Sequence, residues 1–112
     1  MAYALKRFLA SLLVTAAIAV LPAHGNGYFL SGNEALELCS ADPNFCEGLV
    51  MAFNDASTFY NHNLWNRVCM PEGATSTQIK DVYLLFLKEH PADRHDSAIS
   101  QFIRALIDSF PC

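Results

Sequence analysis

Four cysteines restrict the folds open to this chain more than any other feature of its sequence. They are Cys39, Cys46, Cys69 and Cys112, with 6, 22 and 42 residues between successive members. The sequence has no C-x-x-C pair of the kind found in zinc sites, and an even number of cysteines in a short exported chain is typical of a disulfide framework. We therefore expect two disulfides, which would staple a domain too small to bury a large core.

The first 25 residues have the pattern of an export signal. Lys6 and Arg7 provide a basic start, residues 8–21 form an apolar run interrupted only by a serine and a threonine, and residues 22–25 (Pro-Ala-His-Gly) contain a small-x-small pair. This order is that of a secretory signal peptide. The apolar run is also shorter than the roughly 20 residues that a membrane-spanning helix needs. We predict a signal peptide over residues 1–25.

Cleavage after Gly25, or alternatively after Ala23, would release a domain over residues 26–112. That domain would carry five of the 7 Lys and Arg residues, because the other two lie in the signal peptide, against all 11 Asp and Glu residues, for a formal net charge of −6. Such a surface repels phosphate backbones, which argues against nucleic acid as a partner, and it suits solubility and a basic protein partner equally. No membrane contact is expected after cleavage.

Four helices, and no strand pattern of comparable quality, are predicted for the exported part. Ser31 has capping-box spacing to Glu34 ahead of the first helix, although Asn33 is an equally good N-cap. Asp42 followed by Pro43 is a start signal for the second helix. The expected helices cover about residues 33–40, 43–61, 75–89 and 94–110.

The three longer helices have apolar stripes with a period of three to four residues. Thr75 and Gln78 form a second capping box ahead of the third helix, and Pro91 stops it. The residues expected on the buried faces are Cys46, Leu49, Val50, Phe53, Ala56 and Tyr60 in the second helix, Ile79, Val82, Tyr83, Phe86 and Leu87 in the third, and Ala98, Ile99, Phe102, Ile103, Leu106, Ile107 and Phe110 in the fourth.

Short connections between these helices favour antiparallel neighbours, so the predicted fold class is all-α: a small four-helix bundle stapled by disulfides. In such a bundle Cys39 and Cys46 lie at one end, and Cys69 and Cys112 lie at the opposite end. Pairing Cys46 with Cys69 would have to undo a rise of about 20 Å along the second helix. We therefore favour the connectivity Cys39–Cys46 and Cys69–Cys112 among the three that four cysteines allow.

Side chains that might support catalysis are few and do not converge. His90 and His95 stand on either side of a proline, at a spacing that is not a helical metal pair, and His62 lies in an asparagine-rich loop. We expect the first two to shape a turn by bonding to carbonyls freed at a helix end. The cysteines most simply pair with each other, and neither a glycine-rich phosphate loop nor a nucleophile elbow occurs. We expect no catalysis, no metal site and no cofactor.

Two segments suit a binding role better. Trp65 lies near Met70 in a polar loop, where an aromatic side chain either anchors a partner or folds over the end of the bundle as a lid. The charged turn over residues 89–96 is either simply solvated or a means of inserting acidic groups into a basic cleft. From charge and position, the candidate partner-binding residues are Glu89, Asp93, Asp96 and Trp65.

Several short motifs stand at a characteristic joint spacing. They are Leu30–Cys39 (LSGNEALELC), Phe45–Gly48 (FCEG) followed by Asp55-Ala56, Cys69–Gly73 (CMPEG) followed by Thr75 and Gln78, His90–His95 (HPADRH), and Ala105–Cys112 (ALIDSFPC). Over residues 30–112 this spacing resembles the Rap/Tai family of type VI secretion immunity proteins. One departure lies at residues 50–54, where the family tends to have a second glycine after an aromatic residue.

The resemblance implies a small helical protein of the periplasm, often dimeric, that binds a peptidoglycan amidase toxin and blocks its active-site cleft without catalysis. The expected partner is therefore a cognate amidase effector, and a homodimer is a second expectation. In that role Glu89, Asp93 and Asp96 would occupy a polar or cationic cleft around the amidase nucleophile, with Trp65 as an anchor.

A periplasmic acid-stress chaperone of the Hde type is the alternative function. Such a protein has a similar size and helical content, and it would expose apolar surface as its carboxylates take up protons at low pH. A small hydrolase is a third hypothesis, which requires a reactive free thiol or a histidine beside a nucleophile.

Overall fold

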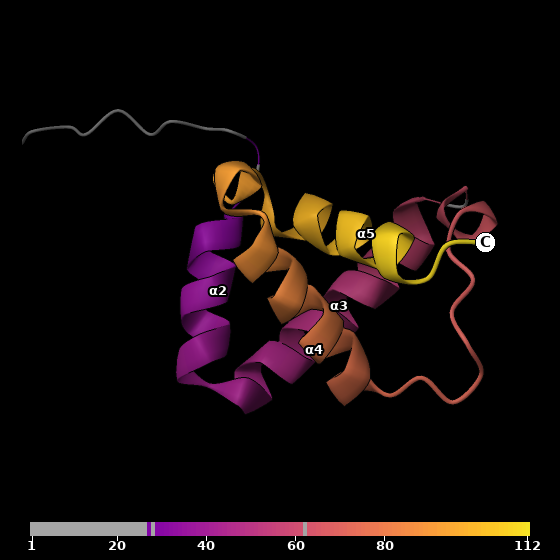
Figure 1. Ribbon diagram of the computed structural model, residues 1–112, viewed down its shortest axis with the longest axis horizontal. Helices are drawn as coiled ribbons and strands as arrows, with labels where there is room; N and C mark the ends of the chain where they lie inside the picture. The colour runs from indigo at the N-terminus through magenta and orange to yellow at the C-terminus, as the bar shows by residue number, and fades with distance from the viewer. Residues whose placement is uncertain (1–26, 28, 62) are drawn as a thin grey trace, which may run out of the picture.

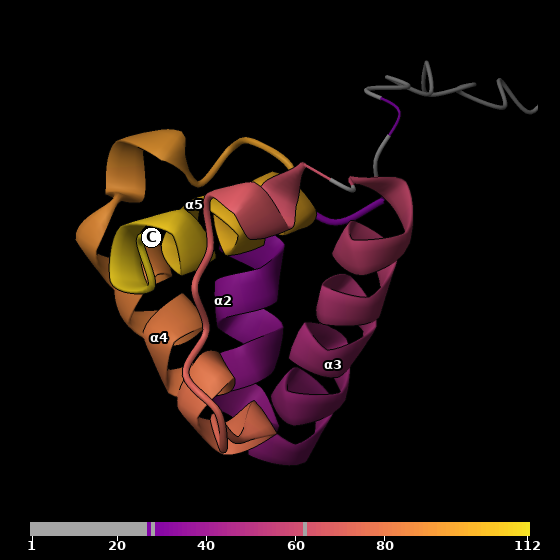
Figure 2. The ribbon, with the colours of Figure 1, turned by 90° about the vertical axis from the view of Figure 1, so that its right-hand side faces the viewer.

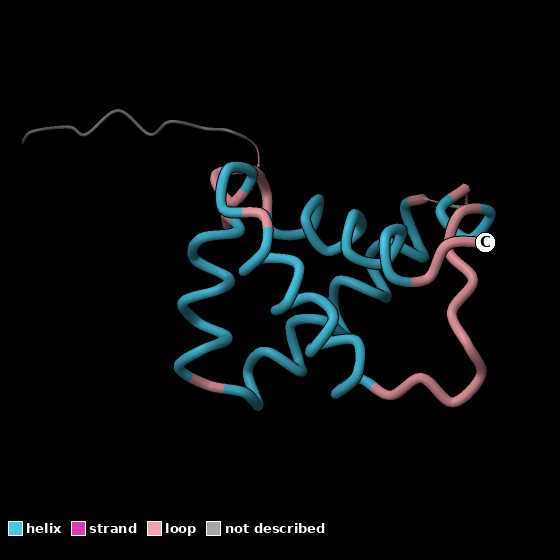
Figure 3. Tube along the Cα trace, viewed as in Figure 1, coloured by secondary structure: helices cyan, strands magenta, loops and turns pink. Residues whose placement is uncertain are grey.

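The computed structural model describes residues 27, 29–61 and 63–112, and all of its regular elements there are helices (Figure 3). The predicted signal peptide lies outside these described residues. The elements are α2 (Gly32–Ala41), α3 (Pro43–Tyr60), η1 (Leu64–Asn66), α4 (Ser76–Glu89), η2 (Pro91–Asp93) and α5 (Ala98–Ser109), where η denotes a short 3-10 helix. The predicted all-α fold with four α-helices is confirmed. None of the described helices is both long and apolar enough to cross a membrane.

The helix α5 lies across the other three α-helices and packs against all of them. Figure 1 shows α5 running at a steep angle to α2. In the view turned by 90°, α3 and α4 approach each other towards the corner where α2 joins α3 (Figure 2). The helix α5 lies across the opposite side, where α3 and α4 are farther apart. The turn before α5 and the C-terminal tail therefore lie at opposite ends of the same helix.

Side-chain caps explain where the helices begin. Ser31, and not Asn33, is the N-cap of α2: its hydroxyl accepts a hydrogen bond from the Glu34 N–H at 3.3 Å, and the Glu34 carboxylate accepts one from the Ser31 N–H at 2.8 Å. Asp42 caps α3 by accepting from two backbone N–H groups, with a proline at the first helical position. Thr75 heads a second capping box at the start of α4.

The last helix begins at Ala98 and not at Arg94, so the predicted start is wrong by one turn. The carbonyls of Arg94 and Asp96 accept hydrogen bonds from the N–H groups of Asn33 and Gly32, at 2.8 and 2.9 Å. A helix starting at Arg94 would need these carbonyls as acceptors for its own backbone. The long-range contact with α2 takes them instead.

The core is built around three aromatic rings from three helices. Phe53 of α3, Tyr83 of α4 and Phe102 of α5 lie with ring centroids 5.6, 5.7 and 6.2 Å apart. Tyr83 and Phe102 are fully buried, and the Tyr83 hydroxyl donates to the Ala98 carbonyl at 2.8 Å. Burial raises the pKa of Tyr83 above its usual value.

The end of α3 departs from the predicted burial pattern. Tyr60, expected on the buried face, is 83% exposed. Ser57 is buried in the last turn of α3, and the Tyr60 ring packs edge-on against the exposed Phe59 ring with centroids 5.0 Å apart. The helical period continued to the last residue of α3, but no neighbouring element covers that position.

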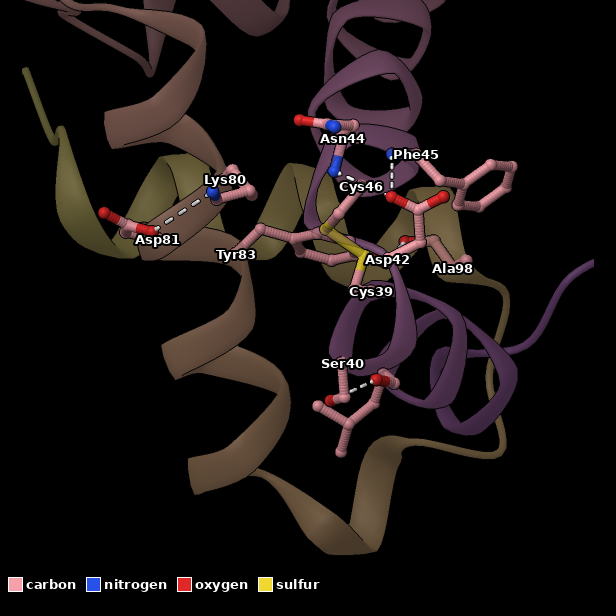
Figure 4. Close-up of a disulfide and its surroundings, with 11 residues drawn as sticks. Cys39, Ser40, Asp42, Asn44, Phe45, Cys46, Lys80, Asp81, Tyr83 and Ala98 are labelled. Carbon is pink, nitrogen blue, oxygen red and sulfur yellow. Dashed lines mark hydrogen bonds and ion pairs between the residues drawn. A yellow bond between two sulfur atoms is a disulfide. The ribbon is translucent and has the colours of Figure 1, made fainter.

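Two disulfides close the domain at opposite ends, with the connectivity favoured from the sequence. Cys39–Cys46 joins the end of α2 to the start of α3 and is buried (Figure 4). Cys69–Cys112 joins the loop before α4 to the C-terminus and is exposed. The Cys69 N–H also donates to the Phe110 carbonyl at 2.8 Å, which holds the loop against the end of α5.

Candidate partner-binding surfaces

The turn between α4 and α5 is held in one shape by hydrogen bonds that its backbone carbonyls accept from α2 and α5. Besides the two hydrogen bonds to the start of α2, its Asp93 carbonyl accepts a bond from the buried Gln101 side chain at 2.7 Å. Gly32 permits the close approach of α2, because a Cβ at that position would lie 3.0 Å from the Arg94 carbonyl oxygen. The candidate side chains of this turn therefore stand on a preformed support.

Asp93 and Asp96 share a cationic neighbour, Arg104 of α5. The Arg104 Nη1 atom lies 3.6 Å from a carboxylate oxygen of Asp93 and 3.8 Å from one of Asp96. All three side chains are about half exposed, so solvent screens these pairs and each contributes little stability. The structure therefore brings Asp93 and Asp96 together, whereas Glu89 is exposed at the last residue of α4.

The charge of this region is balanced and not acidic. Over residues 76–109, which comprise α4, the turn and α5, five Asp or Glu residues stand against four Lys or Arg residues, so the charge is nearly balanced. A partner with a strongly cationic cleft would thus meet little net charge here.

The histidines of the turn have structural partners. The His90 ring stacks on Phe86 with centroids 4.0 Å apart, and its Nδ1 lies 2.8 Å from the Phe86 carbonyl oxygen. The His95 Nδ1 lies 3.0 Å from the Ala92 carbonyl oxygen. Both histidines contact carbonyls at the turn, as predicted, but the Phe86 carbonyl is not a freed one, because it also accepts the His90 N–H at 3.0 Å. His62 lies outside the described residues, and within the part that is described no three His, Cys, Asp or Glu side chains are placed to hold a metal ion.

Trp65 lies in η1, half-buried and packed against the core. This position agrees with the lid interpretation and leaves part of the ring accessible to a partner. The chain around Trp65 joins the end of α5, since Val68 forms a bridge with Pro111. The 12 residues of α5, about 18 Å in length, separate that end from the turn. Trp65 and the carboxylates are therefore not brought into one site.

A different surface, which the predicted site residues did not include, runs along one side of α3 next to its buried face. Five apolar residues recur there at alternating steps of four and three, and a sixth follows: Phe45, Leu49, Ala52, Ala56, Phe59 and Tyr60. We call this set the outer face of α3. Phe45, Phe59 and Tyr60 are 46%, 72% and 83% exposed. The available signal was the width of the apolar stripe: Leu49, Ala56 and Tyr60 belong to the expected buried face, and Phe45, Ala52 and Phe59 extend it to one side.

A groove of about 330 Å³ adjoins the outer face of α3. Its lining is almost wholly apolar and comes from three segments: Phe29 and Leu30, Ala52 and Ala56 of α3, and Ala98 and Ile99 of α5. Because Ala98 follows directly on the turn, the groove connects the outer face of α3 with the residues after Asp96. The two surfaces are therefore neighbours.

Comparison with known proteins decides the family. Residues 31–112 match the family model of Rap1a immunity proteins. The chain belongs to this family. Membership confirms the resemblance found from the motifs and makes the chain a non-enzymatic inhibitor of a cognate type VI secretion effector, so its activity is the binding of another protein. No curated protein and no solved structure matches the chain.

Proposed function

We propose that this Rap1a immunity protein works in the periplasm, where it binds a peptidoglycan amidase effector and blocks its active-site cleft. The observation that carries the proposal is the family match over nearly the whole of the described chain. The two disulfides support the location, since disulfides persist in oxidising compartments such as the periplasm. Residues 1–25 would direct export and be cleaved off in the process.

The proposed contacts with the amidase are Glu89, Asp93 and Asp96 of the turn, with Trp65 as an outlying anchor. Glu89 is exposed at the end of α4 and is the carboxylate best placed to enter a cleft. Asp93 and Asp96 would exchange Arg104 for a donor of the amidase, at small cost because their pairs with Arg104 are half exposed. The preformed backbone of the turn limits the entropy lost on binding.

Co-expression with the toxin encoded by the neighbouring gene tests this function. We expect the two proteins to co-purify and the peptidoglycan cleavage by the toxin to stop at equimolar immunity protein. Glu89→Lys should weaken inhibition, whereas Glu72→Lys, an exposed charge reversal in the loop before α4, should not. Binding without any loss of cleavage would contradict the proposed inhibitory mechanism.

Two further parts of the proposal have their own measurements. N-terminal sequencing of the periplasmic protein should begin at Asn26, or at His24 if cleavage follows Ala23. Light scattering of the exported chain tests the homodimer that the resemblance implies.

For the alternative function, a client-protection assay at about pH 2–3 should give no general protection, because an immunity protein recognises one partner and does not expose apolar surface on acidification.

A further inference from the structure

The basic residues of the exported domain are distributed unevenly along it, whereas the acidic residues are not. Residues 31–66, which form α2, α3 and η1, contain five Asp or Glu residues and no Lys or Arg. Residues 67–112 contain six acidic residues against five basic ones. The part that carries the outer face of α3 therefore has a formal net charge of −5, against −1 for residues 67–112.

The acidic side chains border the outer face of α3 without interrupting it. Asp42 lies beside Phe45 at the start of the helix, where its carboxylate accepts the Phe45 N–H at 3.1 Å (Figure 4). Glu47 turns towards α4, where it accepts a hydrogen bond from the Ser76 hydroxyl. Asp55 lines a separate pocket on that same α4 side. Asp42 therefore borders the start of the apolar strip, and Glu47 and Asp55 add negative charge to the same helix on the side towards α4.

The apolar strip is large enough to matter in binding. The exposed parts of Phe45, Phe59 and Tyr60 together equal about two whole aromatic side chains, or on the order of 400 Å². A stable interface between two proteins buries about 800 Å² on each partner. Three side chains thus supply about half of an ordinary interface, and the adjoining 330 Å³ groove extends the strip towards α5.

From this arrangement we infer that the outer face of α3 and its groove dock an apolar segment of the cognate effector that is flanked by lysine or arginine residues. Charge selects this occupant over a second copy of the chain. Two copies joined through this face would bring together two acidic halves that contain no Lys or Arg, and such like-charged pairing is unfavourable. The inference rests on the proposed binding of an effector but not on that effector being an amidase.

A binding measurement with matched variants tests the inference. The probe is the purified toxin encoded by the neighbouring gene, and the readout is its Kd for the full exported chain. Phe59→Ser with Tyr60→Ser should weaken binding by about 30-fold or more, because the complex loses two aromatic anchors that it would bury. Leu85→Ser is the control, since Leu85 is 56% exposed on α4, outside this face; its Kd should stay within about twofold of the wild-type value.

The charge part of the inference is tested separately. Asp55→Lys should slow association with the toxin and reduce the effect of salt on the Kd, whereas Glu72→Lys in the other half should change neither. Unchanged melting temperatures of all variants would establish that their folds are intact, as expected for exposed sites.

Several outcomes would overturn the inference. One is a wild-type Kd for the Phe59/Tyr60 double variant. Another is a wild-type dimer that becomes monomeric in that variant with toxin binding unchanged, which would assign the face to a second copy. Failure of the wild-type chain to bind the toxin would remove both the inference and the proposed function. Loss of binding in the double variant, with a toxin that does not cleave peptidoglycan, would contradict the amidase proposal alone.

Discussion

At the scale of single residues, Gly32 shows how the absence of a side chain positions the turn before α5. Its N–H donates to the Asp96 carbonyl at 2.9 Å, and a Cβ there would meet the Arg94 carbonyl oxygen at 3.0 Å and the Gln101 side chain at 3.2 Å. The turn before α5 can approach α2 only because this position is a glycine.

We predict that Gly32→Ala lowers the free energy of unfolding by about 1–3 kcal/mol, since a backbone carbonyl has to move to admit the methyl group. Gly48→Ala is the matched control: it lies within α3 with open space around it, so the same substitution should stabilise by up to about 1 kcal/mol through helix propensity. Urea denaturation of both variants measures the difference. Equal effects of the two substitutions would show that the turn does not depend on this contact.

A second residue-scale prediction concerns the pH dependence of Glu34. Hydrogen bonds from the Ser31 N–H and hydroxyl lower the pKa of this carboxyl below its usual value. A lowered pKa in the folded state means that the ionised carboxylate stabilises the fold above the unfolded pKa, about 4.3, and that this contribution is lost as the pH falls through the folded pKa.

Thermal melting of wild-type protein and Glu34→Gln from about pH 7 to about pH 3 checks this. The wild type should melt higher near neutral pH, and the gap should close on acidification. Glu37→Gln, on the same helix outside the capping box, serves as the control for removing one negative charge. A gap that stays constant across the whole range would contradict the assignment.

At the scale of the elements, side-chain caps fix the starts of α2, α3 and α4. Long-range hydrogen bonds to α2 prevent the last helix from starting before Ala98. The α4 capping box of Thr75 and Gln78 lies entirely within four consecutive residues, so it was readable before any fold was known. The start of α5 was not, because the carbonyls of Arg94 and Asp96 bond to residues about 60 positions earlier in the chain.

We expect Thr75→Ala to lower the free energy of unfolding by about 1 kcal/mol, because the Gln78 N–H loses its side-chain acceptor. Thr58→Ala provides the comparison. Thr58 lies within α3, where its hydroxyl donates to the Asn54 carbonyl one turn earlier, so replacing it by alanine should be neutral or slightly stabilising. Chemical denaturation followed by circular dichroism distinguishes the two, and an equal loss in both would argue against the cap.

At the scale of the whole molecule, the two disulfides restrict very different lengths of chain. Cys39–Cys46 links residues 7 positions apart, whereas Cys69–Cys112 links residues 43 positions apart and encloses α4 and α5. On the loop-entropy model the short bridge is worth about 2.5 kcal/mol and the long one about 4 kcal/mol. The exposed long bridge is also the one open to reductants.

We therefore predict that replacing Cys69 and Cys112 together by alanine lowers the free energy of unfolding by about 4 kcal/mol. Replacing Cys39 and Cys46 should lower it by about 2.5 kcal/mol through loop entropy. Lost packing around that buried bridge adds to the second value. Mild reduction followed by thiol labelling should modify Cys69 and Cys112 first. Earlier labelling of Cys39 would mean that the corner between α2 and α3 opens more readily than the C-terminal end.

The sequence by itself determined the local features of this protein: the all-helical class, three of the four helix starts, the aromatic and aliphatic core stripes, and a disulfide pairing that follows from which ends of the helices hold the cysteines. The helix class, starts and stripes act within about one or two helical turns, so neighbouring residues specify them. The pairing of Cys69 with Cys112, 43 positions apart, follows instead from the expected antiparallel order of the helices. The family was also readable from motifs at fixed spacing.

Only the tertiary structure decided which candidate surfaces coincide. It paired Asp93 and Asp96 with Arg104, placed Trp65 at the other end of α5, and left Phe59 and Tyr60 uncovered beside an apolar groove. The physical reason is that exposure and net charge at a surface depend on which helix packs against which. A residue at an apparently inward position, such as Tyr60, is buried only if a distant segment lies over it.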